Sequence, residues 1–145
     1  MSLLTLLKPE RGPDFVVGGK ENPYLLRWWL IPRNRFFNVY LHKFMRSDDD
    51  RAEHTHPWAF NASWLLSGEY WEWAHGIPSM RRAGQVKFRW GASQHRIELT
   101  NGPCWTLFFT GPVVRQWGFI CPQGFVHWRK FTAPHDRGQI GRGCE

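Results

Sequence analysis

Turn-forming residues cut the second half of this 145-residue chain into short segments, and their spacing constrains the fold more than any other feature. Glycine, proline and asparagine recur at Gly68, 76–78, Gly84, Gly91, 101–103, 111–112 and 122–124. The segments between them predict strands over 58–66, 69–74, 85–89, 95–99, 105–110, 114–120 and 125–131. Many short strands at such spacing are typical of an antiparallel sandwich or barrel, so we expect an all-β protein.

A longer apolar segment over 36–45 precedes these strands. Both faces of this predicted strand are apolar, so we expect a second sheet on one face and a second copy of the chain on the other, in a homodimer. Aromatic residues make up 17% of the chain, which also favours strands. We expect at most one short helix, near Trp28 and Trp29. Most strand tryptophans should lie in the core, namely Trp64, Trp71, Trp73, Trp105, Trp117 and Trp128.

The length matches a single domain over 1–145. Proline and glycine interrupt every periodic run near the start, so residues 1–30 are expected to form an irregular N-terminal arm over a barrel spanning 31–132. Residues 133–145 contain Pro134 and three glycines and are expected to be a flexible tail.

Three cysteines, Cys104, Cys121 and Cys144, form an odd set without a C-x-x-C pair. This pattern argues against a disulfide framework and against a zinc site built from cysteine. The chain starts with an apolar run too short for a signal peptide, and no run reaches the roughly 18 residues of a membrane span. We therefore expect a cytoplasmic protein without a membrane partner. A formal charge of +7 leaves anionic partners open.

His54 and His56 form the sharpest local pattern. In a strand, residues two apart point to the same face, so both imidazoles would project into one space. This arrangement suits two neighbouring positions on a metal ion. A hydrogen-bonded pair or a solvated strand edge would produce the same pattern, and the two residues alone do not decide between these interpretations.

The residues that follow this pair resemble the motifs of the cupin family. His-x-His is followed by Asn61, six further residues and Gly68, and ten residues separate Gly84 from His95. The resemblance extends over about 46–100. Two positions depart from the family pattern: Asn61 stands where a glutamate ligand is usual, and Trp90 stands where the second motif usually has proline.

The resemblance implies a cupin-type β-barrel or jelly roll that binds a divalent metal through His54, His56 and His95. In lacking this glutamate, the chain resembles the three-histidine thiol dioxygenases. That resemblance makes Fe(II) the first choice of metal, with Zn(II) or Ni(II) as alternatives. Three neutral ligands would leave the ion its full charge, which favours a small anionic substrate. Asn61 would contribute a weak amide ligand or hold a water.

Several further residues are candidates for lining such a site. His42 shares a predicted strand face with Tyr40 and would support a ligand or act as a core histidine. Trp58 follows His56 closely enough to line the mouth of the cavity, and His127 alternates with apolar neighbours. Arg115 is a candidate clamp for a carboxylate or phosphate, as is Arg96, although each would equally be a surface arginine stacked on tryptophan.

Three functions remain open at this point. The first is a metal-dependent oxygenase, dioxygenase-like, acting on a small molecule. The second is a cupin without catalytic activity that binds a metal or a small ligand, which the missing glutamate favours. The third, ranked last, is a basic nucleic-acid-binding module. The arginines are scattered along the chain without a large cluster, so we do not expect nucleic acid as a partner.

Overall fold

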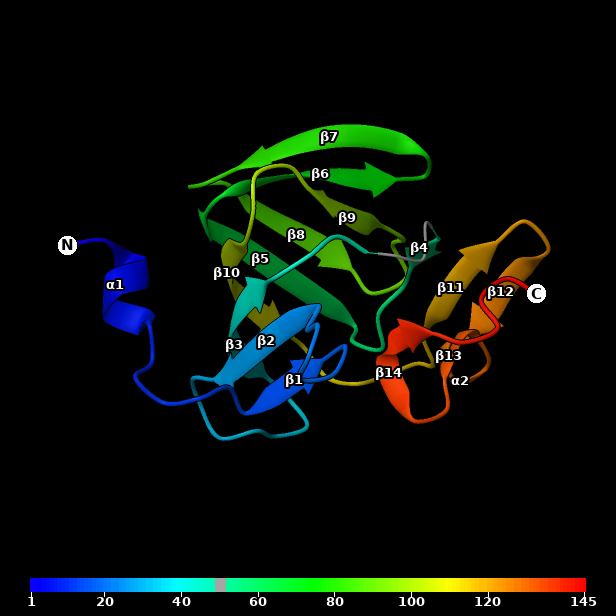
Figure 1. Cartoon of the computed structure of the whole chain (residues 1–145), viewed down its shortest axis with the longest axis horizontal. Helices are drawn as coiled ribbons and strands as arrows, with labels where there is room; N and C mark the ends of the chain where they lie inside the picture. The colour runs from blue at the N-terminus through cyan, green and yellow to red at the C-terminus, as the bar shows by residue number, and fades with distance from the viewer. Residues whose placement is uncertain (49–51) are drawn as a thin grey trace.

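A six-stranded antiparallel sheet is the largest element of the computed structural model, which describes residues 1–48 and 52–145 (Figure 1). In spatial order its strands are β1 (Phe15–Val17), β2 (Leu25–Trp29), β3 (Asn38–Phe44), β10 (Cys104–Thr110), β5 (Phe60–Ser67) and β8 (Val86–Trp90). Cross-strand register places His42 opposite both Arg27 and Thr106. Because side chains alternate between faces, these three share the interior face of the sheet.

Two three-stranded sheets form the second layer. One contains β7 (Ile77–Arg82), β6 (Glu69–Ala74) and β9 (Arg96–Leu99), and the other β12 (Gly124–His127), β11 (Gly118–Cys121) and β4 (Glu53–His54). Reciprocal backbone hydrogen bonds between His54 and His95, of 2.8 and 3.1 Å, join β4 to the start of β9. Buried side chains from both layers pack together between them: Leu25, Phe44, Leu65, Tyr70, Ile97 and Cys104.

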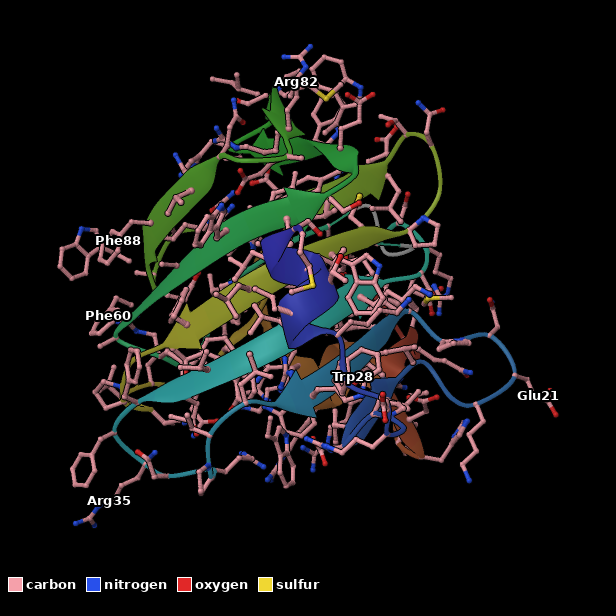
Figure 2. The ribbon with its side chains drawn as sticks, turned by 90° about the vertical axis from the view of Figure 1, so that its left-hand side faces the viewer. Glu21, Trp28, Arg35, Phe60, Arg82 and Phe88 are labelled. Atoms are coloured by element: carbon pink, nitrogen blue, oxygen red, sulfur yellow. A yellow bond between two sulfur atoms is a disulfide. The ribbon has the colours of Figure 1, made fainter. Side chains whose placement is uncertain are left out.

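The outer face of the six-stranded sheet carries a helix of the same chain. Figure 2 shows α1 (Leu3–Leu7) lying across this face, near Trp28. Leu41, on the outer side of β3, is completely buried. The second apolar face of this strand is thus covered within one chain, and it does not by itself require a second copy. Of the described helices, neither is long and apolar enough to cross a membrane.

The N-terminal segment is more regular than the sequence suggested. Trp28 and Trp29 lie in β2, so the helix expected there is wrong. Within the expected arm, β1 and β2 pair with each other, and β2 continues onto β3. Trp28 stacks on Trp105 of β10 with ring centroids 5.5 Å apart. This cross-strand packing, which local periodicity does not reveal, selects the strand.

The C-terminal segment is also ordered by contacts distant in sequence. Helix α2 (Trp128–Phe131) leads into a hairpin of β13 (Thr132–Ala133) and β14 (Asp136–Ile140), so the expectation of a frayed tail is corrected. Cys121 and Cys144 form a disulfide. The cysteine count argued against a disulfide framework, and this single bond corrects that expectation. An odd number of cysteines still allows one pair and one free thiol, here the buried Cys104.

Strand positions within the barrel mostly follow the predicted segments, and β6 coincides with 69–74. The segment predicted over 114–120 is an exception, because only its end forms a strand, in β11. Strand β7 has no predicted counterpart because Pro78 lies in it. Proline is tolerated there since β7 pairs only with β6 among the described strands. The predicted strand 125–131 ends early, where His127 accepts a hydrogen bond from the Arg129 amide and α2 begins. At Gly68, between β5 and β6, the backbone has φ +90° and a Cβ would overlap Cys104.

The predicted burial of the tryptophans is wrong for most of them. None of the six is fully buried and Trp71 is 37% exposed, although Trp117 and Trp128 are half-buried against the core cluster around Phe119 and Phe131. On β6 the inward positions belong to Tyr70 and Glu72, each 2% exposed. The inward face of β6 is therefore the one that carries Tyr70 and Glu72, and not the one that carries the tryptophans. A hydrophobicity pattern does not reveal this, because it does not show the charged partners of Glu72 inside the barrel.

Candidate metal centre

Three imidazoles converge between the two layers. His54 comes from β4, His56 from the segment after it, and His95 from the position just before β9. Their ring centroids are 4.9–5.1 Å apart. One nitrogen from each ring can be chosen so that all three lie within 4.8 Å of one another. The structure therefore brings together the three residues that the motif resemblance implied.

Backbone contacts hold the two His-bearing segments in place. The His56 amide donates to the Gly91 carbonyl at 3.1 Å, and the Gly91 amide donates to the Ala59 carbonyl at 3.0 Å. Gly91 is needed here because a Cβ at this position would overlap the carbonyl oxygen of Trp58. Together with the His54–His95 backbone hydrogen bonds, these bonds attach both ends of the segment 54–59 to the segment 91–95.

A buried carboxylate orients His95. Nδ1 of His95 donates to Glu72 Oε1 at 2.9 Å, which leaves the lone pair of the neutral ring on Nε2, facing the other two histidines. Glu72 also accepts from Arg89 Nε at 2.6 Å and from Arg81 Nε at 2.7 Å. Three strands thus contribute to one charge network, and its carboxylate orients His95 through the contact that metal-binding histidines usually have.

Burial determines the protonation of these groups. It lowers the pKa of His54 to about 4 and lowers the pKa of His56 well below its ordinary value. Burial also lowers the pKa of His95, although the hydrogen bond to Glu72 opposes that shift. For Glu72, burial raises the pKa, but His95 and Arg89 together hold it well below its usual range. At neutral pH the site therefore has three neutral imidazoles beside an ionised carboxylate, the form that metal binding requires.

The separation of two ring nitrogens tests the fit to a metal. His56 Nε2 and His95 Nε2 are 2.9 Å apart. For metal–nitrogen distances of about 2.1 Å, ligands at a right angle are about 3.0 Å apart, whereas tetrahedral ligands are about 3.4 Å apart. The spacing fits neighbouring positions of an octahedral ion, and it equally fits a hydrogen bond from His56 to His95. The donor set suits Fe(II), Ni(II) or Zn(II), each of which imidazole ligands bind.

All three histidines border a cavity of about 720 Å³ that extends between the sheets. Aromatic side chains form much of its wall, including Trp58, Phe108, Trp117 and Phe119. Trp58 stacks on His56 with centroids 5.5 Å apart. A cavity of this size accommodates a small organic molecule next to the histidines.

The structure separates the other predicted residues into two groups. Of the residues predicted beside the metal ligands, His42 and Trp58 line the cavity. His42 is buried and accepts a hydrogen bond from Arg27 Nε at 2.8 Å. Tyr40 lies behind it, with its ring stacked on that of His42 at 5.8 Å. Asn61 is fully buried outside the cavity lining, and neither of its side-chain polar atoms has a hydrogen-bond partner among the described residues.

The second group lies at the surface. Arg115 is exposed and donates from Nη1 to the Trp58 carbonyl at 3.2 Å, so it supports the segment that carries His56 from outside the cavity. His127 contacts Gln116 at 2.8 Å and caps α2. Arg96 stacks on Trp73, with its guanidinium carbon 4.7 Å from the ring centroid. None of these three borders the cavity.

Sequence reasoning missed three charged residues: Glu72, Arg89 and Arg27. All three alternate with aromatic or apolar neighbours in short strands, as in Tyr70-Trp-Glu-Trp73. A charged side chain at one position of an otherwise apolar strand was the available signal. It was not sufficient, because alternation identifies two faces without showing which one points inward.

Comparison with known proteins adds information on the fold. No protein-family model matches the sequence, and no curated protein matches it. A conserved protein of Klebsiella pneumoniae with a double-stranded β-helix domain aligns at TM-score 0.55 and 16% identity, over 72% of this chain and 90% of its own. A cupin superfamily protein from Desulfitobacterium hafniense aligns at 0.53 and 14%, over 77% and 89%.

A third solved structure, the Fe(II) form of HppE, aligns at TM-score 0.57 and 15% identity. The aligned region covers 70% of this chain and 57% of the HppE chain. Identities this low carry information on the fold alone.

Proposed function

We propose that this chain, whose cupin fold is the one predicted from the motif resemblance, is an Fe(II)-dependent oxygenase of a small organic molecule. The observation that carries the proposal is the convergence of His54, His56 and His95 on one wall of an aromatic-lined cavity. The Fe(II) form of HppE, which shares the fold, supports iron as the metal.

When bound, a divalent iron would supply open coordination positions for dioxygen and substrate. The residues of the chain have separate tasks. His54, His56 and His95 would hold the ion, and Glu72 would keep the Nε2 lone pair of His95 directed at it. The aromatic wall would orient the substrate and exclude water from the site.

The first test is a calorimetric titration of chelator-stripped protein with Fe(II) under anaerobic conditions, and with Zn(II) and Ni(II). We expect one ion per chain, and an affinity lower by roughly 100-fold in His95→Ala, because two imidazoles remain. His75→Asn is the matched control: it removes an exposed imidazole at a position with φ 52°, which asparagine tolerates. Equal, weak binding by wild type and His95→Ala would show that no metal site exists.

The second test is oxygen consumption by the iron-loaded protein with a panel of small thiol and hydroxy acids. Turnover that His95→Ala abolishes supports the oxygenase. Tight metal binding without oxygen consumption by any substrate would favour the alternative, a cupin that binds a metal or small ligand without catalysis.

A cytoplasmic location remains a prediction, and the structure contains one feature that opposes it. Disulfides such as Cys121–Cys144 are rare in the reducing cytosol. Thiol labelling of protein extracted under acid quench from its native cells tests the location. A labelled Cys144 supports the cytoplasm, and a protected one contradicts it.

A further inference from the structure

Arg27 projects from β2 into the wall of the cavity that holds the three histidines. Its Nε donates to Nε2 of His42 at 2.8 Å. The guanidinium carbon lies 4.6 Å from the ring centroid of Tyr40 and 5.9 Å from that of Phe15. These contacts fix the guanidinium in a largely apolar environment.

Arg27 has no counter-ion in the part of the chain that the structure describes. Among residues 1–48 and 52–145, no carboxylate forms an ion pair with it, and its one hydrogen bond goes to a neutral imidazole. Burial lowers the pKa of Arg27 to about 10, so the side chain is still charged at neutral pH. Arg27 is half-buried, and a charge that is partly removed from water without a partner costs free energy, which a bound anion would offset.

Arg89, which also borders the cavity, differs from Arg27 in this respect. It forms an ion pair with Glu72, so its charge is already compensated. In total, five arginines and two aspartates border the cavity, and the described lining includes no lysine or glutamate. The cavity therefore has a surplus of positive charge even before a metal ion is considered. Arg33 and Arg137 of this lining are exposed, whereas Arg27 is half-buried and no ion pair with a described carboxylate compensates its charge.

The geometry of the guanidinium indicates which anion fits. Because His42 occupies Nε, the two terminal nitrogens remain as parallel donors on one edge of a planar group. Such a pair matches the two oxygens of a carboxylate or of a phosphate group. The neutral state of His42 matters here: burial and the charge of Arg27 hold the pKa of His42 well below its ordinary value, so the imidazole accepts the Nε–H bond.

We propose that Arg27 binds the oxyanion group, carboxylate or phosphate, of the molecule that occupies this cavity, and that His42 positions its guanidinium. The assignment of that molecule as the substrate of the histidine site rests on the proposed function. The anion site itself does not, because it is built from residues that do not belong to the histidine cluster.

The experiment uses chelator-stripped protein, so that a missing metal site cannot mimic a missing anion site. Wild type is titrated by calorimetry with inorganic phosphate and with acetate, at constant ionic strength. We expect saturable binding of at least one of them, and an affinity at least tenfold lower in Arg27→Gln. Stronger binding of phosphate would indicate a phosphorylated or phosphonate ligand, and stronger binding of acetate a carboxylic acid.

The matched control is Arg35→Gln, which removes the same charge from an exposed arginine stacked on Phe36, outside the cavity. Its affinity should stay within twofold of wild type. If Arg27→Gln does not fold, Arg27→Lys decides, because it keeps the charge but loses the paired donors and should weaken binding several-fold. Failure of wild type to bind either anion, or equal binding by wild type and the Arg27 variant that folds, would overturn the proposal.

Discussion

Glu72 connects the candidate site to the stability of the barrel. Its carboxylate is 2% exposed and contacts His95, Arg89 and Arg81. Arg89 is itself only 5% exposed, so the buried charges of Glu72 and Arg89 compensate each other. Removing one partner of a buried pair costs more free energy than the pair contributes, because the remaining charge stays buried.

We expect Glu72→Gln to lower the free energy of unfolding of the metal-free protein by about 3–5 kcal/mol. Glutamine can still accept the His95 hydrogen bond, but Arg89 loses its counter-ion. Glu98→Gln is the control, since Glu98 is half exposed and pairs with Arg96 at 3.5 Å, and it should cost under about 1 kcal/mol. Urea unfolding of both variants provides the comparison, and equal effects would contradict the role assigned to Glu72.

At the scale of elements, the site depends on how closely β8 approaches the segment after β4. Strand β8 ends at Trp90, and Gly91 then contacts the backbone of residues 56–59. Two histidines are placed by this approach. The backbone amide of His56 donates a hydrogen bond to the Gly91 carbonyl, and His95 follows Gly91 by only four residues. A side chain at Gly91 would push the two segments apart.

We expect Gly91→Ala to lower the free energy of unfolding by about 1–3 kcal/mol, because the new Cβ overlaps the Trp58 carbonyl and neighbouring backbone must shift. Displacement of His56 should also weaken metal binding, by roughly tenfold. The titration described above measures this effect. Gly12→Ala, where a Cβ meets no atom within 4 Å, should change neither quantity. Unchanged metal affinity in Gly91→Ala would exclude the backbone contact as a determinant of the site.

At the scale of the whole molecule, an apolar surface lies on the outer side of β5 and β8. Val86, Phe88 and Trp90 alternate along β8 and are 64%, 50% and 66% exposed. Figure 2 shows Phe60 and Phe88 projecting from this side, and their rings stack with centroids 5.9 Å apart. Among the described strands, β8 pairs only with β5, so its other edge is free. Exposed aromatic residues beside a free strand edge favour association.

We expect the homodimer predicted from the sequence to form through this β8 surface, and not through the outer face of β3, which α1 and Trp28 cover. A two-fold arrangement would place two β8 strands edge to edge and bury both sets of aromatic rings. Sedimentation at micromolar concentration in 0.15 M salt should give about twice 17.2 kDa for wild type and a monomer for Phe88→Glu. Ile77→Glu, on an exposed position of β7, is the control. A wild-type species near 17 kDa would contradict the dimer.

Local patterns in the sequence determined most strand positions and the pairing of His54 with His56, and the resemblance to cupin motifs added His95. Turn residues interrupt strands where they occur, and His54 and His56 lie two residues apart, so local spacing alone places their side chains together. Only the tertiary structure decided which face of β6 is inward, because the burial of Glu72 instead of Trp71 depends on arginines from β7 and β8. The same holds for Arg27, whose position facing His42 follows from strand register, and for Cys121 and Cys144, which the C-terminal hairpin brings together. Partners distant in sequence set these features, and local periodicity contains no information about them.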